Sequence, residues 1–224
     1  MIRISAAGWS VAFSERGDGD LRVSGRGPGE SRELVVRHVL ESLRLDGAAV
    51  PRQHHSADVA VLEAPVSGYS VGLEPADGVA TALAGVAAGV HVADCLPIAI
   101  GTDGAVVMLH CGWRGLAGGI VGEGVRALRE LGADGPLEAV IGPGAGGCCY
   151  ETGEEVRERF SAWDASRGRL LDLKAVAAGQ LREAGVSTVQ DVGLCTICAP
   201  ARRFFSHRRD GASTGRQGGY AWLG

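Results

Sequence analysis

The stretch Val106–Gly115 reads VVMLHCGWRG, an apolar run that ends abruptly at His110 and Cys111. Its first four residues are apolar without alternation, which is typical of a strand buried on both faces. Apolar residues then recur at helical spacing over Leu116–Leu131, which predicts a helix. His110 therefore lies where a strand ends and a helix is about to begin. In open α/β sheets ligands bind at such positions, because the loops there vary while the sheet stays fixed.

The segment before this stretch predicts a β-hairpin. The apolar run Leu96–Ile100 is followed by the turn Thr102-Asp103-Gly104 and then by the strand that ends at His110. Cys95 and His110 are about equidistant from the turn. We therefore expect these two side chains to lie close together across neighbouring strands.

The remaining pattern mixes strands and helices along the whole chain. Further strands are expected within 2–15 and over Val59–Leu62, Val90–Val92, Leu137–Ile141, Val186–Val192 and Gly219–Leu223; helices over Ser31–Leu45, Glu154–Trp163 and Leu173–Ala184; and a loop over Arg16–Glu30. Hairpins and crossovers are both present, and no linker interrupts them. We expect an α/β (α+β) fold, with residues 1–224 forming a single domain of mixed β-sheets flanked by helices.

Composition narrows the class of protein. Of the 224 residues 46% are hydrophobic, enough for a sizeable core, and the net charge of −4 argues against a nucleic-acid or anionic-membrane surface. The N-terminus has no apolar core of signal-peptide length, and the apolar tract Gly78–Val92 is too short to span a bilayer. We expect a soluble cytoplasmic protein whose six cysteines are reduced, and free, metal-binding or catalytic.

Three soft or titratable side chains lie at expected loop or strand ends. They are one histidine of the pair His54-His55, Cys95 in Ala-Asp-Cys, and His110. Catalytic zinc takes three nitrogen or sulfur ligands from the protein and keeps a fourth position for water. The set fits that chemistry, although each side chain is also compatible with ordinary packing in the core.

Two further clusters allow more than one interpretation. Cys195 and Cys198 form a CxxC pair, but Cys148-Cys149 lacks the spacing of a matching pair for structural zinc, and Ala199-Pro200 does not resemble the helix start of a redox motif. We interpret this CxxC as structural or incidental. The aromatic and arginine residues of Phe204–Gly211 would either stack a base and hold a phosphate or form a solvated basic loop.

Several motifs together resemble those of the laccase-domain family. They are HCGWRG at His110, ADCLP at Ala93, IGPGAGGCCYE at Ile141, FFSHRRDG at Phe204 and TGRQ at Thr214. They cover nearly the whole chain in the family's order. Members were first described as multicopper polyphenol oxidases and are now named purine nucleoside phosphorylases; peptidoglycan editing factor is a further name.

The resemblance implies a zinc ion held by two histidines and a cysteine in a mixed-sheet α/β domain. The family's Q-x-H-G motif aligns with Gln53 and selects His55, with Ser56 in place of the glycine; the other ligands are then Cys95 and His110. The implied activity is phosphorolysis of adenosine, inosine, guanosine and methylthioadenosine, with adenosine deamination at the same site. The chain departs from the family in a shortened N-terminal loop, Ser14–Leu21.

Chemistry then suggests roles for individual residues near these motifs. Asp94 is a candidate for proton transfer or for supporting a ligand, beside Cys95 and His110 in the catalytic group. Candidates for binding phosphate are the arginines Arg16, Arg114, Arg208 and Arg216. The expected partners are purine nucleosides and phosphate, and the oligomeric state stays unknown.

Two other activities remain possible from the sequence. A copper-dependent polyphenol oxidase would require more metal ligands than six histidines and two methionines supply. A hydrolase that edits peptidoglycan precursors would use Cys95 as nucleophile and His110 as base.

Overall fold

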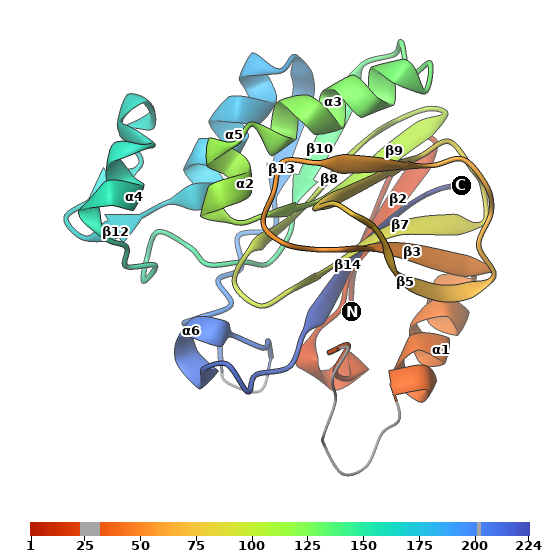
Figure 1. The fold of residues 1–224 in the computed structure, drawn as a ribbon, viewed down its shortest axis with the longest axis horizontal. Helices are drawn as coiled ribbons and strands as arrows, with labels where there is room; N and C mark the ends of the chain where they lie inside the picture. Colours follow the sequence, from red (N-terminus) through yellow and green to blue (C-terminus); the bar gives the residue numbers. More distant parts are fainter. Residues whose placement is uncertain (23–31, 201–202) are drawn as a thin grey trace.

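The computed structural model describes residues 1–22, 32–200 and 203–224. Two mixed β-sheets lie between helices in these residues (Figure 1). Sheet 1 has the order β1-β2-β14-β7-β3-β5, with bounds Ile2–Ala6, Trp9–Phe13, Gln217–Leu223, Val86–Val92, Gly47–Arg52 and Gly68–Pro75. Sheet 2 has the order β13-β10-β8-β9-β6-β4, with bounds Val186–Asp191, Leu137–Ile141, Leu96–Thr102, Ala105–Cys111, Gly78–Thr81 and Val59–Leu62.

The helices cover the outer faces of the two sheets. Helix α1 (Arg32–Leu43) packs on sheet 1, and α2 (Trp113–Ala117), α3 (Ile120–Glu130) and α5 (Leu173–Glu183) pack on sheet 2 (Figure 1). The shorter elements are α4 (Glu154–Glu158), α6 (His207–Asp210), the 3₁₀ turns Arg16–Asp18 and Ser161–Trp163, and the hairpin of β11 (Ser166–Arg167) and β12 (Leu170–Leu171). None of the described helices has the length and apolar character needed to cross a bilayer.

Strand β9 is buried on both of its faces. Val106 and Met108 pack into the core between the sheets, whereas Val107 and Leu109 pack into the core beneath α3 and α5. Side chains of a strand alternate between faces, so a strand with a core on each side needs apolar residues at every position. This arrangement explains the unbroken run VVML.

The predicted hairpin is confirmed. β8 and β9 pair antiparallel from Thr102↔Ala105 at the turn to Leu96↔Cys111 at the open end. Pro97 is opposite His110, so Cys95, two residues earlier in the chain, lies near His110. The α/β class with mixed sheets flanked by helices is confirmed as well.

Several element boundaries differ from those predicted. The helix expected over Leu116–Leu131 is two helices, because the chain turns at Gly118-Gly119 and Gly119 has a left-handed φ of 87°. The helix expected over Glu154–Trp163 ends at Glu158, and a 3₁₀ turn follows. Part of the loop expected over Arg16–Glu30, residues 23–30, lies outside the described residues, as does Ser31 at the start of the predicted helix.

Strands β3, β5 and β6 and the first half of β7 were not predicted. Many of their residues are glycine or alanine, which have low strand propensity. The close approach of neighbouring chains explains this composition: a Cβ on Gly47 would lie 2.0 Å from the carbonyl oxygen of Val66. Tertiary packing therefore overrides local propensity here.

Candidate active site

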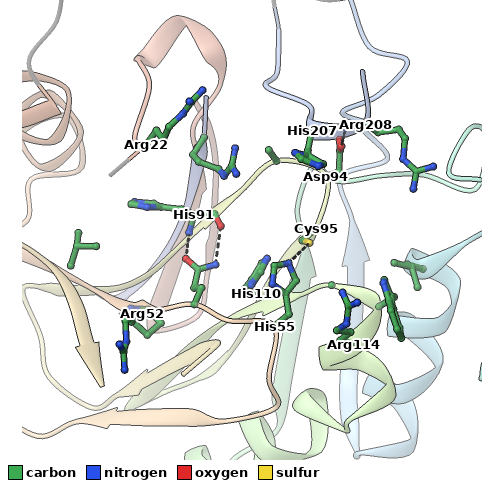
Figure 2. Close-up of a pocket in the computed structure, with 18 of the residues that line it drawn as sticks. Arg22, Arg52, His55, His91, Asp94, Cys95, His110, Arg114, His207 and Arg208 are labelled. Atoms are coloured by element: carbon green, nitrogen blue, oxygen red, sulfur yellow. Dashed lines mark hydrogen bonds between the residues drawn. The ribbon is translucent and has the colours of Figure 1, made fainter. Parts of the chain in front are cut away.

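The structure brings His55, Cys95 and His110 together at one end of the sheets (Figure 2). Cys95 precedes β8, His110 lies near the end of β9, and His55 lies in the connection from β3 in sheet 1 to β4 in sheet 2. One ligand atom from each residue lies within 4.8 Å of the other two. The His55 Nε2 to Cys95 Sγ distance is 3.8 Å.

A buried carboxylate orients two of these three residues. Asp77, which is fully buried, lies 2.7 Å from Nδ1 of His110 through its Oδ1. Its Oδ2 accepts hydrogen bonds from the backbone N–H groups of His54 and Ser56, on either side of His55, at 3.1 and 2.6 Å. Since Nδ1 of His110 donates to Asp77, its Nε2 is left as the ligand atom. In metal sites, a ligating histidine typically donates its other ring N–H to a carboxylate, as His110 does here.

The segment that carries His55 has a defined conformation. His55 has a left-handed φ of 66°, and the side chain of Gln53 pairs with both backbone groups of His91 at 2.8 Å. The neighbouring His54 lies outside the metal-ligating group and contacts Asp58, with 46% of its side chain exposed. The two adjacent histidines therefore have different surroundings.

Cys95 and His110 stabilise each other's charged forms. Burial raises the pKa of Cys95, but the positive charge of His110 and hydrogen bonds from both histidines outweigh it and lower the pKa to about 6. Burial lowers the pKa of His110, and the thiolate and Asp77 together raise it to about 9. The pKa of Asp77 is held well below its usual range: burial opposes this shift, and the hydrogen bonds from His110 and Ser56 outweigh it.

The donor set of this group fits a divalent transition metal. Two imidazole nitrogens and one thiolate are ligands that zinc accepts, and three protein ligands leave one position for water. His55 is exposed toward the cavity, while His110 is buried against Asp77. A metal held by these residues would therefore be open to the cavity on one side.

Asp94, next to Cys95, connects its own loop to other loops through hydrogen bonds. It has a left-handed φ of 90° and is buried. Its carboxylate accepts from the hydroxyl groups of Thr196 (2.6 Å) and Ser206 (3.1 Å) and from the backbone N–H of Arg208 (2.7 Å). These bonds tie the segment that carries Cys95 to two loops near the C-terminus of the chain.

The three metal-ligating residues open into a cavity of about 850 Å³ with a basic lining. Within the described part of the chain, Asp94 is the only acidic residue of this lining, although the chain as a whole has a net charge of −4. The labelled arginines surround the histidines and Cys95 (Figure 2). The lining arginines are Arg22, Arg52, Arg114, Arg208 and Arg216.

The arginines expected to bind phosphate differ in their positions. Arg114 stacks on Trp113, with its guanidinium carbon 4.4 Å from the ring centroid, and Arg208 lies over Tyr150. Arg216 also lines the cavity, whereas Arg16 lies outside the lining and forms an ion pair with Asp210 at 2.9 Å.

Arg22 takes a position in the cavity that the sequence did not reveal. Its Nε is buried and has no hydrogen-bond partner among the residues that the structure describes. Burial and the positive charge of Arg22 both lower the pKa of Arg216. Two cations that repel each other beside an unsatisfied donor indicate a site for an anion.

Sequence reasoning also missed Asp77 and misjudged the cysteines. From the sequence, Asp77-Gly78 indicated only a turn. Arg22 lay in an expected loop, and a loop has no periodic pattern from which the direction of a side chain can be predicted. The expectation that Cys195 and Cys198 lack a matching pair is wrong, because their sulfur atoms and those of Cys148 and Cys149 lie within 4.8 Å of one another. The signal was present in the chain, since each pair follows a predicted strand.

Residues 29–224 match the model of the family described as multi-copper polyphenol oxidoreductase laccase. The chain belongs to this family. The resemblance drawn from the motifs is therefore confirmed.

Relatives in the laccase family include enzymes of two named activities. A purine nucleoside phosphorylase of Streptomyces coelicolor is 38% identical over 205 residues, which are 86% of this chain and 81% of that protein. The adenosine deaminase RL5, from an unknown prokaryotic organism, is 33% identical over 193 residues, 77% of this chain and 73% of the relative. The crystal structure of the Bacillus licheniformis protein YfiH has the same fold, with a TM-score of 0.85 and 23% identity, covering 96% of this chain and 93% of that one.

Proposed function

We propose that this chain is a zinc-dependent purine nucleoside phosphorylase that also deaminates adenosine. One observation carries the proposal: a His55–Cys95–His110 group opens into a cavity that five arginines in the described part of the chain line. A nucleoside and a phosphate would occupy this cavity together. The names of the relatives in Streptomyces coelicolor and of RL5 support both activities. The functional unit proposed is the whole of residues 1–224, located in the cytoplasm.

His55, Cys95 and His110 would hold the zinc ion, and Asp77 would orient His110. Bound there, zinc would supply Lewis-acid activation of a water molecule, which is the chemistry that deamination of a purine requires. In that reaction water adds at the ring carbon that bears the amino group, and ammonia leaves. Asp94, whose carboxylate already accepts three hydrogen bonds, supports the loop that carries Cys95.

The arginines would bind and orient phosphate. Guanidinium groups pair with phosphate oxygens through two hydrogen bonds, and the paired oxygens are then held for attack on the sugar. In phosphorolysis an oxygen of hydrogen phosphate forms the bond to the anomeric carbon and the glycosidic bond breaks. The base leaves and takes up the proton that the phosphate gives up. We assign phosphate binding to Arg22, Arg114, Arg208 and Arg216, with Arg22 in place of Arg16 because Arg16 is engaged by Asp210.

Aromatic side chains in the same cavity would receive the base. Trp113 and Tyr150 line it, and each has an arginine over its ring. A purine stacks on such side chains without regard to its substituents. This surface is consistent with adenosine, inosine, guanosine and methylthioadenosine as substrates.

Product analysis with and without phosphate tests the proposal. Adenosine should yield adenine and a ribose phosphate only when phosphate is supplied, and inosine should form without phosphate. Cys95→Ala should abolish deamination and zinc binding at the His55–Cys95–His110 group, and it should lower phosphorolysis. Arg114→Ala or Arg208→Ala should weaken phosphorolysis more than deamination.

The same experiment separates the alternatives. Adenine formation at full rate without phosphate would mean hydrolysis. Copper in the purified protein with oxidation of phenols and no nucleoside turnover would indicate an oxidase. Hydrolysis of peptidoglycan precursors by the metal-free protein, lost in Cys95→Ala, would indicate the editing enzyme.

A further inference from the structure

Four cysteines outside the cavity form a second compact group. Cys148 and Cys149 follow the glycine-rich segment after β10, and Cys195 and Cys198 follow β13. β10 and β13 are adjacent parallel strands, so their C-terminal loops leave the sheet at the same edge. A backbone bridge between Gly144 and Cys195 keeps the two loops side by side beyond the sheet.

The four sulfur atoms lie close enough together to share one ion. Cys148 and Cys198 are 3.4 Å apart at Sγ, as are Cys149 and Cys195, and Cys148 and Cys149 are 3.5 Å apart. All four lie within 4.8 Å of one another. A Zn–S bond of about 2.3 Å in tetrahedral geometry places sulfurs about 3.8 Å apart, whereas a disulfide needs about 2.0 Å. The spacing matches four ligands around one ion.

Backbone groups around Cys195 also suit a thiolate. The N–H of Gly146 donates to its sulfur at 3.3 Å, and the N–H groups of Ile197 and Cys198 donate to the same atom. Hydrogen bonds to the charged form stabilise it. The turn after the first cysteine of this CxxC pair directs backbone N–H groups toward the sulfur. These groups stabilise the thiolate, which is the form of cysteine that binds a metal.

We propose that Cys148, Cys149, Cys195 and Cys198 bind a structural zinc ion, separate from the His55–Cys95–His110 group. Four protein thiolates fill the coordination of zinc and leave no position for substrate, which makes the site structural. An iron–sulfur cluster would need room for several atoms between the thiolates. Sulfurs within 4.8 Å of one another enclose space for a single ion.

Zinc at this site would fix one wall of the cavity. Tyr150, which lines the cavity, follows Cys149 directly. Thr196 lies inside the CxxC turn and donates to the carboxylate of Asp94 at 2.6 Å. An ion that binds both loops together would therefore hold Tyr150 and Asp94 in place without contacting the substrate.

Metal content of the purified full-length chain tests this proposal. The wild-type protein, prepared under reducing conditions, should contain two zinc ions per chain by mass spectrometry. The double variant Cys195→Ser/Cys198→Ser should contain one, as should His55→Ala. Cys111→Ala, which changes the cysteine outside both groups, should keep two. Cobalt(II) replacing zinc should give an intense thiolate charge-transfer band that keeps most of its intensity in His55→Ala. In the double variant the band should fall to the weaker absorption of the single Cys95 thiolate.

A measurement on the wild-type chain keeps the proposal testable if the cysteine variants do not fold. Stepwise modification with a thiol reagent should release one zinc ion in step with the loss of four thiols. One zinc per chain, lost completely in His55→Ala, would overturn the proposal. So would a thiol count showing these four cysteines joined as disulfides in freshly purified protein. Neither result bears on phosphate-dependent turnover, so the two proposals fail independently.

Discussion

At the scale of single residues, Asp77 contacts both segments that carry histidines of the candidate zinc site. Replacing it by asparagine places an amide N–H₂ among N–H donors and removes the charge that faces His110. Loss of such a supporting carboxylate typically costs about 10–100-fold in metal affinity. We expect Asp77→Asn to weaken zinc binding by this factor in competition with a chelator.

The control for this prediction is Asp58→Asn. Asp58 is exposed and contacts only the neighbouring His54 among the histidines described above. Its substitution should leave zinc affinity unchanged. Equal affinities in a folded Asp77→Asn variant and in the wild type would contradict the role given to Asp77.

The adjacent histidines give a second prediction. His55→Ala should remove zinc from the His55–Cys95–His110 group, because this residue supplies one of three ligands. His54→Ala should leave zinc content at the wild-type level, since His54 supplies no ligand atom and its ring lies 3.6 Å from Asp58 and 3.5 Å from Asp77. Elemental analysis of both variants distinguishes the two residues. Loss of zinc in His54→Ala but not in His55→Ala would contradict the assignment of His55 as the ligand.

Arg22 and Arg16 lie in the same loop but in different environments. We expect Arg22→Ala to raise the KM for phosphate by about tenfold or more, since a hydrogen bond to a charged group contributes about 1.5–3 kcal/mol. Arg16→Ala is the matched control, and its KM for phosphate should change far less. Steady-state phosphorolysis at varied phosphate measures both. A larger effect from Arg16→Ala would restore that residue to the phosphate site.

At the scale of elements, β9 contributes to two cores at once. Leu109 is fully buried in the core between sheet 2 and its helices. Leu109→Ala should lower the free energy of unfolding by about 2–5 kcal/mol. Leu34→Ala, on α1 with 53% of the residue exposed, should lower it by less than about 1 kcal/mol. Denaturant titrations provide the values, and equal losses would contradict the burial of Leu109 in this core.

The sequence predicted those elements whose local pattern matches their surroundings. The hairpin of β8 and β9 was predictable because a two-residue turn separates two apolar runs, and it placed Cys95 beside His110. The glycine- and alanine-rich strands were not, because close packing of chains, as at Gly47, selects small residues over good strand formers. Asp77 and the partners of Cys195 were missed since both depend on contacts between segments distant in sequence.

At the scale of the whole molecule, an acidic chain surrounds a basic cavity. The net charge is −4, while five arginines and one carboxylate of the described residues line the cavity. Salt screens the attraction between these arginines and phosphate, with a Debye length of about 10 Å at 0.1 M and 3 Å at 1 M. We expect the KM for phosphate to rise several-fold over this range of sodium chloride. The KM for adenosine in deamination, a neutral substrate, should change little; equal shifts would argue against an electrostatic phosphate site.

The position of β14 has a consequence for synthesis of the protein. This strand lies between β2 and β7 and pairs with both, yet it follows every other strand in the chain. Until Gln217–Leu223 has left the ribosome, β2 and β7 each present an unpaired edge to other nascent chains. Unpaired edges are templates for aggregation. Sheet 1 therefore stays incomplete for longer during translation than sheet 2, whose last strand, β13, emerges earlier.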